Sequence, residues 1–454
     1  MGPILPYLLP FVSGILLAVG ALWMKNPFFK LAERSVGLLN VLVAPIDEDE
    51  KFELVNKKVM ETVGSLLIVL AMATMVVVGA IAVYTGFFQS LTFEPVKSAL
   101  VLLAVGSLIP FVVPKKKKSA YGAMAQLFHR LVLDNYHLGR KLLNYQIKGV
   151  DPTSQVDGTY SRVLITGLAR AGTTALTKEL AQRGAFASLD YSNMPVLLAP
   201  KLWAKIYNPK RTEDKERAHG DGVKVGLASV EALEEYFFKV LKDDSYIKED
   251  GLYEHELSAE ENELCRRYQN SIAGPKVYLA KNNNAALRLQ SLTEHNPDLA
   301  VFLLVRDPLQ HAFSLMQQHK KFSAQQEDDP FIKEYMDWLG HHEFGHGQRP
   351  FVLGGVGNHK GDPKDLNYWL VRWLNYYSKV HLSENTFVLT YEDFLETPTS
   401  TLRAISAALG ITINLADTKN FNKAPVSVEH VNQALLSEAN ALYEQLKSKC
   451  LKIS

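Results

Sequence analysis

The chain has 454 residues, enough for roughly two or three domains of about 150 residues, which excludes a single small binding module. With 47% hydrophobic and 21% charged residues, the composition excludes an intrinsically disordered chain and a collagen-like fibre. Because 49 Lys and Arg residues are balanced by 48 Asp and Glu residues, the chain has no excess of basic charge, and we expect no nucleic-acid partner. Two cysteines, Cys265 and Cys450, are too few for a disulfide framework and lack the paired spacing of a zinc site, which favours a reducing compartment.

Three uncharged segments near the N-terminus predict about three transmembrane helices, at about residues 3–24, 63–88 and 98–114. The first two approach or exceed the ~20 apolar residues that cross a bilayer, whereas the third is short enough to be a re-entrant segment instead. No basic region precedes the first segment and no small-residue cleavage site follows it, which favours a span over a cleaved signal peptide. We therefore expect residues 1–118 to be a membrane anchor in contact with the lipid bilayer.

The basic residues around these segments predict the orientation of the anchor. Six Lys and Arg residues lie between the first and second segments, Lys97 alone lies between the second and third, and residues 115–118 are all Lys. Since basic connections stay in the cytoplasm, the N-terminus should be outside and the C-terminal part cytoplasmic. The alternative for the Lys run is a solvated linker.

Residues 119–158 are expected to join the anchor to a globular part. Apolar residues recur with helical spacing from Met124 to Tyr136 and predict one amphipathic helix. This helix would lie in the lipid headgroup region or pack on the globular part, and Asp151, Pro152 and Gly158 then mark a linker.

A possible phosphate loop follows the linker. Arg162–Thr166 reads as a short buried strand, and a turn bounded by Gly167 and Gly172 then opens a helix. Backbone N–H groups at such a helix start bind anions. A Walker A loop has Lys directly after its second glycine, whereas this chain has Thr173 there and Arg170 as the nearby cation, which disfavours an ATPase or GTPase. A purely structural turn is the alternative.

A second possible anion site follows a later strand, residues 300–305. The strand ends at Arg306, and Ser314 lies eight residues further on, in the helix after Asp307-Pro308. A guanidinium at the carboxyl end of a strand and a hydroxyl two helical turns on can converge on one anion. Two anion sites at strand ends imply a ligand with two separated phosphates.

These motifs together resemble the sulfotransferase family. The run Arg170-Ala171-Gly172-Thr173-Thr174 is similar to the family's 5'-phosphosulfate loop, and Arg306 with Ser314 is similar to its 3'-phosphate site. Tyr391-Glu392-Asp393 resembles a segment whose Tyr lies near the adenine in that family. Residues 192–203 and 216–222 resemble a bacterial branch, and the resemblance covers about residues 162–415.

The resemblance implies a P-loop-like α/β domain, residues 159–454, with a central parallel sheet flanked by helices. It implies transfer of a sulfonyl group from 3'-phosphoadenosine 5'-phosphosulfate to an acceptor hydroxyl or amine. The residues present require no metal, and we expect the anchor to lie in a bacterial inner membrane. Because an anchor raises the local concentration of lipids, the expected acceptor is a lipid, glycolipid or lipid-linked sugar. The competing interpretation is a nucleotide-binding membrane scaffold without catalysis.

The sequence offers more than one candidate for the residue that deprotonates the acceptor. Lys281 ends a predicted strand, residues 277–280, and the resemblance implies that it follows the bridging oxygen of the leaving phosphate. Cytosolic members place a catalytic His two residues after this Lys, where the chain has Asn283. His219 is the first candidate for the general base, and Glu234 or Glu235 is the second; the alternatives are a loop His and solvated helix carboxylates.

One rival motif is His342-Glu343-Phe344-Gly345-His346, which matches the H-E-x-x-H signature of zinc peptidases. That signature needs a helix, and Gly340, Gly345 and Gly347 interrupt this one. A structural or acceptor-site loop is the other interpretation.

Overall fold

The computed structural model describes residues 5–43, 48–88, 123–153, 156, 158–207, 215–216, 224–225, 232–355, 361–415 and 431–452. The chain divides into two compact units, Met1–Leu131 and Val132–Ser454. The boundary falls inside the segment, 119–158, that the sequence assigned to the connection between anchor and globular part.

The first unit contains two long helices that pack along one another, α1 (Leu5–Val43) and α2 (Glu48–Phe88). At Gly20 of α1 an added Cβ atom would lie 2.5 Å from a methyl of Val76 on α2, so only glycine allows this approach. Arg34 donates to the Ser65 hydroxyl at 2.6 Å and to the Glu61 carbonyl at 2.8 Å. These contacts make the two helices a hairpin.

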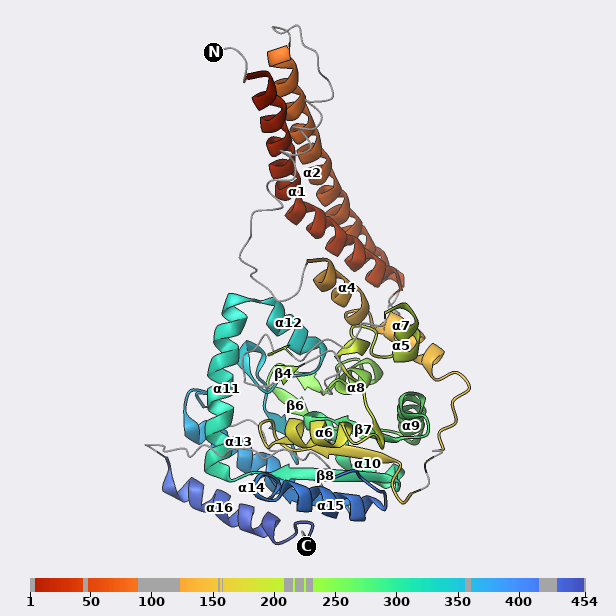
Figure 1. The fold of residues 1–454 in the computed structure, drawn as a ribbon, viewed down its shortest axis with the longest axis vertical. Coiled ribbons are helices and arrows are strands. Elements are labelled where there is room, and N and C mark those ends of the chain that lie inside the picture. Colours follow the sequence, from red (N-terminus) through yellow and green to blue (C-terminus); the bar gives the residue numbers. More distant parts are fainter. Residues whose placement is uncertain are drawn as a thin grey trace. The chain divides into compact units, whose positions relative to one another are not determined.

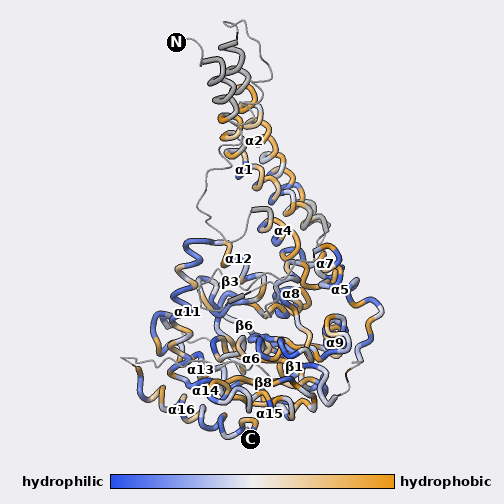
Figure 2. Tube along the Cα trace, in the orientation of Figure 1, coloured by the Kyte–Doolittle hydropathy of each residue, from blue (hydrophilic) through white to orange (hydrophobic). Residues whose placement is uncertain are grey.

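The prediction of about three spans is corrected by the first unit. Among the residues that the structure describes, one stretch, Leu54–Gly79 of α2, is long and apolar enough to cross a membrane by length and composition alone. Figure 2 shows this part of α2 as mainly hydrophobic. The first predicted span forms the start of α1, a helix that continues without a break through Lys25 and Lys30. The third, 98–114, lies outside the described residues, as do Lys97 and Lys115–Lys118.

The single amphipathic helix expected from Met124 to Tyr136 is two helices, α4 (Ala123–Leu133) and α5 (Tyr136–Gln146). The break occurs because Asn135 caps α5, with its side-chain oxygen accepting a hydrogen bond from the Leu138 N–H at 2.9 Å.

A five-stranded parallel sheet forms the centre of the second unit (Figure 1). Its order is β10-β8-β1-β7-β2, so β1 lies in the middle and the chain crosses from one side of β1 to the other between β7 and β8. The expected α/β fold with a parallel sheet flanked by helices is confirmed. The bounds are β1 Arg162–Thr166, β2 Phe186–Ala187, β7 Val277–Lys281, β8 Leu299–Val305 and β10 Thr386–Thr390.

The three central strands are buried on both faces, as continuous apolar runs in a parallel sheet require. One core joins alternate strand residues, such as Ile165 and Phe302, to Leu176 of α6 (Thr173–Ala181) and Leu402 of α15 (Pro398–Leu409). Alternation along β1 and β8 therefore decides which side chains meet these helices. Helix α13 (Leu366–Lys379) is rich in aromatic residues, and its Trp369, Trp373, Tyr376 and Tyr377 are buried in the core.

The remaining elements connect the strands or extend the sheet edges. The helices are α7 Pro200–Ile206, α8 Glu235–Lys242, α9 Ala259–Ala273, α10 Leu289–His295, α11 Pro308–Asp328, α12 Phe331–Trp338, α14 Tyr391–Glu396 and α16 Gln433–Lys447, with short 3-10 turns η1 Tyr191–Asn193, η2 Asn283–Arg288 and η3 Gly345–Gly347. The short strands are β3 Lys215–Glu216, β4 Lys224–Val225, β5 Ile247–Lys248, β6 Gly251–Tyr253 and β9 Phe351–Val352.

Candidate functional site

The predicted phosphate loop connects β1 to α6 at the carboxyl end of the central strand. Gly172 is the residue before α6 and has φ 95°, a conformation that L side chains rarely adopt. Arg170 also has a positive φ, 71°, although it is not glycine. Such a residue costs free energy and persists where the surrounding structure holds it, which is common at functional sites.

The second predicted anion site lies beside this loop. Arg306 follows β8, the neighbour of β1, and donates from its guanidinium to the carbonyl of Arg170 at 3.1 Å. The Arg170 guanidinium in turn donates to the Ser314 hydroxyl at 3.2 Å, and Asp307 caps the helix that carries Ser314. The two motifs, 136 residues apart in the chain, are thus in contact at the carboxyl edge of the sheet, where open parallel sheets bind ligands.

Tyr391 lies against both motifs. The Arg306 guanidinium carbon is 4.7 Å from the centre of its ring, within the range of a cation–π contact. A Cβ atom added to Gly172 would come within 2.3 Å of the same ring, so glycine is required here for space as well as for backbone conformation.

The segment that carries Tyr391 is held from two directions. The Glu392 carboxylate accepts the Asp307 N–H at 3.2 Å and the Tyr443 hydroxyl at 2.9 Å. Tyr443 belongs to α16, a C-terminal helix to which the sequence assigned no role. Its contact links the end of the chain to the start of α11.

Two side chains that the sequence did not single out, His311 and Tyr377, form hydrogen bonds with the backbone of the phosphate loop. His311 is fully buried, with Nε2 2.7 Å from the Ala169 carbonyl. Burial lowers the pKa of His311 to about 3, so the ring is neutral and its Nε2–H donates. The Tyr377 hydroxyl donates to the Leu304 carbonyl at 2.8 Å and accepts from the Leu168 N–H at 3.3 Å. An isolated His and one Tyr among many give no sequence signal for this.

Lys281 ends β7 and is buried next to β1. Each of the three asparagines after it has a different partner. Asn282 donates to Glu235 at 2.9 Å, and Asn284 donates to the carbonyl of Gly340 at 2.7 Å. The Asn283 amide oxygen is 3.4 Å from the Thr173 hydroxyl of the phosphate loop, and its amide nitrogen donates to Glu343 at 3.1 Å.

The two candidate carboxylates at the start of α8, Glu234 just before the helix and Glu235 as its first residue, are both buried, so the alternative of solvated helix carboxylates is wrong. Glu235 pairs with Arg288 through two hydrogen bonds, at 2.7 and 2.8 Å, and also accepts from Asn282 and from the Tyr246 hydroxyl. Burial opposes ionisation, but Arg288 and these hydrogen bonds hold the pKa of Glu235 below its usual value. Burial raises the pKa of Glu234, which accepts a hydrogen bond from Gln269 at 2.9 Å.

His219, the other candidate base, lies outside the described residues. The remaining predicted site residues are near the phosphate loop: Ala171 is buried within it, and Thr174 is half-buried in the first turn of α6.

The H-E-x-x-H segment is not an α-helix. His342 to Phe344 form an irregular loop, followed by the 3-10 turn η3, so the two histidines lack the one-turn spacing that the zinc signature requires. His342 is buried beside Arg349, whose guanidinium lies 2.8 Å from Nδ1, whereas His346 is exposed. Burial first, and then Arg349, lower the pKa of His342 to about 3. Within the described ranges, no group of three His, Cys, Asp or Glu side chains could hold a metal.

Comparison with solved structures finds several sulfotransferases at low sequence identity. STF1 of Mycobacterium tuberculosis has a TM-score of 0.38 and 16% identity, over 72% of this chain and 86% of that chain. STF9 of Mycobacterium avium has a TM-score of 0.36 and 15% identity, over 76% and 81%. A sulfotransferase from Alicyclobacillus acidocaldarius has a TM-score of 0.26 and 12% identity, over 63% and 93%.

No curated protein matches the chain. A family model does match it, over the part that contains the phosphate loop, Arg306, Ser314 and the three asparagines after Lys281. Residues 162–349 of this chain are thereby matched to the sulfotransferase family.

Proposed function

We propose that the second unit is a sulfotransferase that uses 3'-phosphoadenosine 5'-phosphosulfate as the donor of a sulfonyl group. The observation that carries the proposal is the contact of Arg306 with both the Arg170 carbonyl and the Tyr391 ring. Residues from three distant motifs thereby share one site at the carboxyl edge of the sheet, where one nucleotide with two separated phosphates can meet all of them.

The chemistry of these groups fits such a donor. The phosphate loop offers backbone N–H groups at the start of α6, with the positive end of the helix dipole behind them. Arg306 has a buried Nε–H without a hydrogen-bond partner among the described residues, and a buried donor of this kind is costly unless a ligand accepts from it. We assign Arg170, Ala171, Gly172, Thr173 and Thr174 to the 5'-phosphosulfate, Arg306 and Ser314 to the 3'-phosphate, and Tyr391 to the adenine.

The proposed reaction moves the sulfonyl group to an acceptor hydroxyl or amine. Like phosphoryl transfer, it asks the protein mainly to position two reactants and to stabilise charge on the leaving group. Lys281, at the end of β7 next to β1, is the cation that we assign to the leaving 5'-phosphate.

We also propose that the first unit anchors the protein in a membrane, with the second unit in the cytoplasm of a bacterial cell. Support for the anchor comes from the apolar stretch Leu54–Gly79. Support for the orientation comes from the run Lys115–Lys118, which precedes the second unit and should stay in the cytoplasm with it. An anchored enzyme meets lipids at high effective concentration, so the proposed acceptor is a lipid, glycolipid or lipid-linked sugar. Labelling of a lipid extract with radioactive donor tests this: a labelled lipid is expected, and label only in water-soluble products would contradict it.

Calorimetry of the full-length protein in detergent with adenosine 3',5'-bisphosphate tests the donor site. We expect binding that weakens at least about tenfold, or ~1.4 kcal/mol, in Arg306→Ala. The exposed Arg403 of α15 provides the control, and Arg403→Ala should bind as the wild type does. Binding that is indifferent to Arg306→Ala would overturn the assignment.

The same preparation separates the enzyme from a non-catalytic nucleotide-binding scaffold. Both bind the bisphosphate, but only the enzyme releases it from the phosphosulfate donor when an acceptor is present. Release with a lipid extract, measured against the same mixture without protein, is the result that we expect.

A further inference from the structure

We propose that Glu343 is the general base that removes the proton from the acceptor hydroxyl; this inference rests on the proposed function. A hydroxyl is a weak nucleophile until its proton is taken, and a base must reach that proton. Glu234 and Glu235 are buried and engaged with other side chains. Glu343 is half-buried, and the sequence singled it out only as part of a zinc motif that the fold does not form.

The position of Glu343 follows from two hydrogen bonds of Asn283. The amide nitrogen of Asn283 donates to the Glu343 carboxylate at 3.1 Å, and its amide oxygen lies 3.4 Å from the Thr173 hydroxyl. One side chain therefore separates the carboxylate from the phosphate loop, where the 5'-phosphosulfate is proposed to bind. An acceptor that approaches the sulfonyl group from this side would meet the carboxylate.

The partner of Glu343 also suits a base. Glu235 pairs with a guanidinium, which stabilises its ionised form and opposes uptake of a proton. Asn283 is a neutral amide, so it orients the Glu343 carboxylate without that opposing charge. Tyr376 fixes Asn283 in turn, since its hydroxyl donates to the Asn283 carbonyl at 3.4 Å.

The loop that carries Glu343 is held rigidly on both sides. At Gly340, with φ 68°, an added Cβ atom would lie 2.6 Å from Glu235, and at Gly345, with φ 75°, it would lie 2.3 Å from Gln326. The Gly345 N–H donates to His319 at 3.2 Å, and the next N–H, of His346, donates to Gln326 at 2.7 Å. A rigid support of this kind keeps a catalytic group in its productive geometry.

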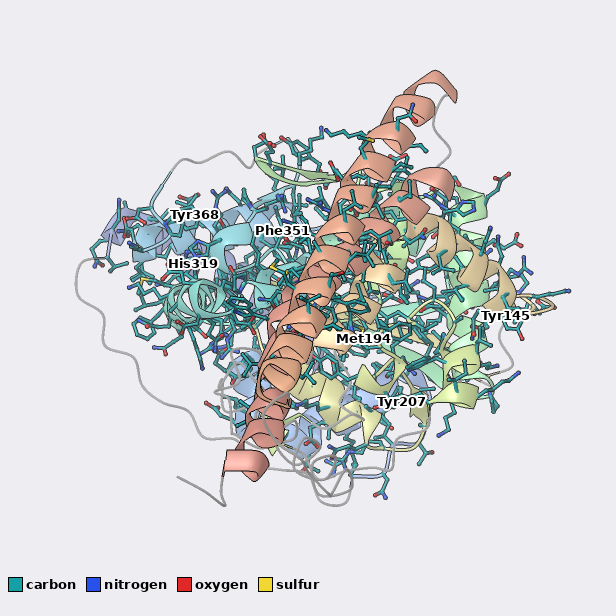
Figure 3. All side chains as sticks on the ribbon, turned by 90° about the horizontal axis from the view of Figure 1, so that it is seen from above. Tyr145, Met194, Tyr207, His319, Phe351 and Tyr368 are labelled. Atoms are coloured by element: carbon teal, nitrogen blue, oxygen red, sulfur yellow. The ribbon has the colours of Figure 1, made fainter. Side chains whose placement is uncertain are left out.

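Aromatic packing adds to this support. Phe344, next to Glu343, packs on Trp369 of α13, whose ring also lies 5.5 Å from that of His319. The hydroxyl of Tyr368 donates to Gln348 of the same loop at 2.9 Å. Figure 3 shows His319 and Tyr368 on one side of the second unit, away from Tyr145 and Tyr207.

The Glu343 carboxylate takes the acceptor proton while the acceptor oxygen forms a bond to sulfur. The bond between sulfur and the oxygen of the 5'-phosphate breaks, and that oxygen keeps the electron pair. The products are the sulfated acceptor, adenosine 3',5'-bisphosphate and a protonated Glu343, which returns its proton to water.

The test compares full-length wild type, Glu343→Gln and Glu343→Ala, with radioactive phosphosulfate donor and lipid extract as the acceptor source. We expect kcat to fall at least about 100-fold in Glu343→Gln, with the affinity for adenosine 3',5'-bisphosphate unchanged within about twofold. Unchanged affinity shows that the variant is folded. Sodium formate should restore part of the turnover of Glu343→Ala, because a small carboxylate can occupy the vacated space. The exposed Glu263 of α9 gives the control, Glu263→Gln, which should match the wild type.

The outcomes separate this inference from the proposed function. Wild-type turnover that persists in Glu343→Gln would overturn the base assignment and leave the sulfotransferase assignment standing. Loss of turnover without formate rescue, together with weakened bisphosphate binding, would assign Glu343 a structural role instead. A wild type that binds the bisphosphate but transfers no sulfonyl group would overturn both.

Discussion

The Glu235 carboxylate and the Arg288 guanidinium form a two-bond ion pair, at 2.7 and 2.8 Å, in a place where neither side chain is exposed by more than 1%. The Glu235 carboxylate also accepts a hydrogen bond from the side-chain amide of Asn282, the residue that directly follows Lys281. The ion pair is thus connected through Asn282 to the end of β7, which carries Lys281. Its loss would lower the stability of the fold and displace the residues at this strand end.

Removal of one partner of this pair is expected to be costly. Arg288→Ala leaves a buried carboxylate without its counter-charge and should lower the free energy of unfolding by about 3–5 kcal/mol. Urea unfolding in non-ionic detergent, followed by tryptophan fluorescence, measures this.

Two further variants show whether the cost comes from the unpaired charge. The double variant Arg288→Met, Glu235→Leu should be more stable than Arg288→Ala, because it buries no unpaired charge. At the partly exposed pair Lys333 and Asp337, Lys333→Ala should cost less than about 1 kcal/mol. Equal losses at both pairs would contradict the argument.

Stability should fall as the pH is lowered from about 6.5 toward 3. Burial lowers the pKa of His311 and of His342 to about 3 and that of His255 to about 4. Between pH 6.5 and the lowered pKa of each histidine, the unfolded chain binds a proton at that histidine and the folded chain does not. Each histidine therefore removes up to about 1.4 kcal/mol per pH unit.

His342→Gln tests this dependence between pH 6.5 and 5, a range above the ordinary pKa values of carboxylates. Unfolding free energies of the variant should depend less steeply on pH than those of the wild type. The same substitution at the exposed His295 controls for the loss of an imidazole, and a reduced slope in both variants would contradict a specific effect of burial.

Gly172→Ala should abolish tight binding of adenosine 3',5'-bisphosphate. The added methyl would lie 2.3 Å from the Tyr391 ring, and alanine would also be strained at φ 95°. Calorimetry should show at least a tenfold loss of affinity, ~1.4 kcal/mol. Gly184 is the control position for backbone strain without a steric clash, because it has φ 77° and nothing lies within 4 Å of an added Cβ atom. Gly184→Ala should cost about 1–2 kcal/mol of stability and leave the affinity unchanged; an equal loss of affinity in both variants would refute the collision.

In the first unit, two helical glycines should respond in opposite directions to the same substitution. Gly20→Ala places a methyl 2.5 Å from Val76 and should destabilise the hairpin of α1 and α2, whereas Gly37 has nothing within 4 Å. Gly37→Ala should stabilise α1 by about 1 kcal/mol through helix propensity. Loss of helical circular dichroism during titration with sodium dodecyl sulfate measures both, and stabilisation by Gly20→Ala would disprove the close packing.

Much of the fold could be predicted because its signals are local. The strands beginning near Arg162, Val277 and Ala300 are short apolar runs next to polar turns, and the structure has each of them within one residue of the predicted bounds. Hydropathy located the apolar stretch Leu54–Gly79, but it does not show that the first apolar run continues as one helix into a charged half. The break at Asn135 was missed because helical spacing persists across a cap.

The sequence by itself determined the short apolar strands, the glycine-bounded turn after the first of them and the polar side chains at strand ends, since each is a pattern within a few neighbouring residues. The parallel sheet was expected only from the family resemblance. Only the tertiary structure decided which distant groups touch. It joined Arg306 to the Arg170 carbonyl, buried Glu235 on Arg288 and brought Asn283 between Thr173 and Glu343. The physical reason is that strand order and burial determine these contacts, and the spacing of residues along the chain predicts neither of them.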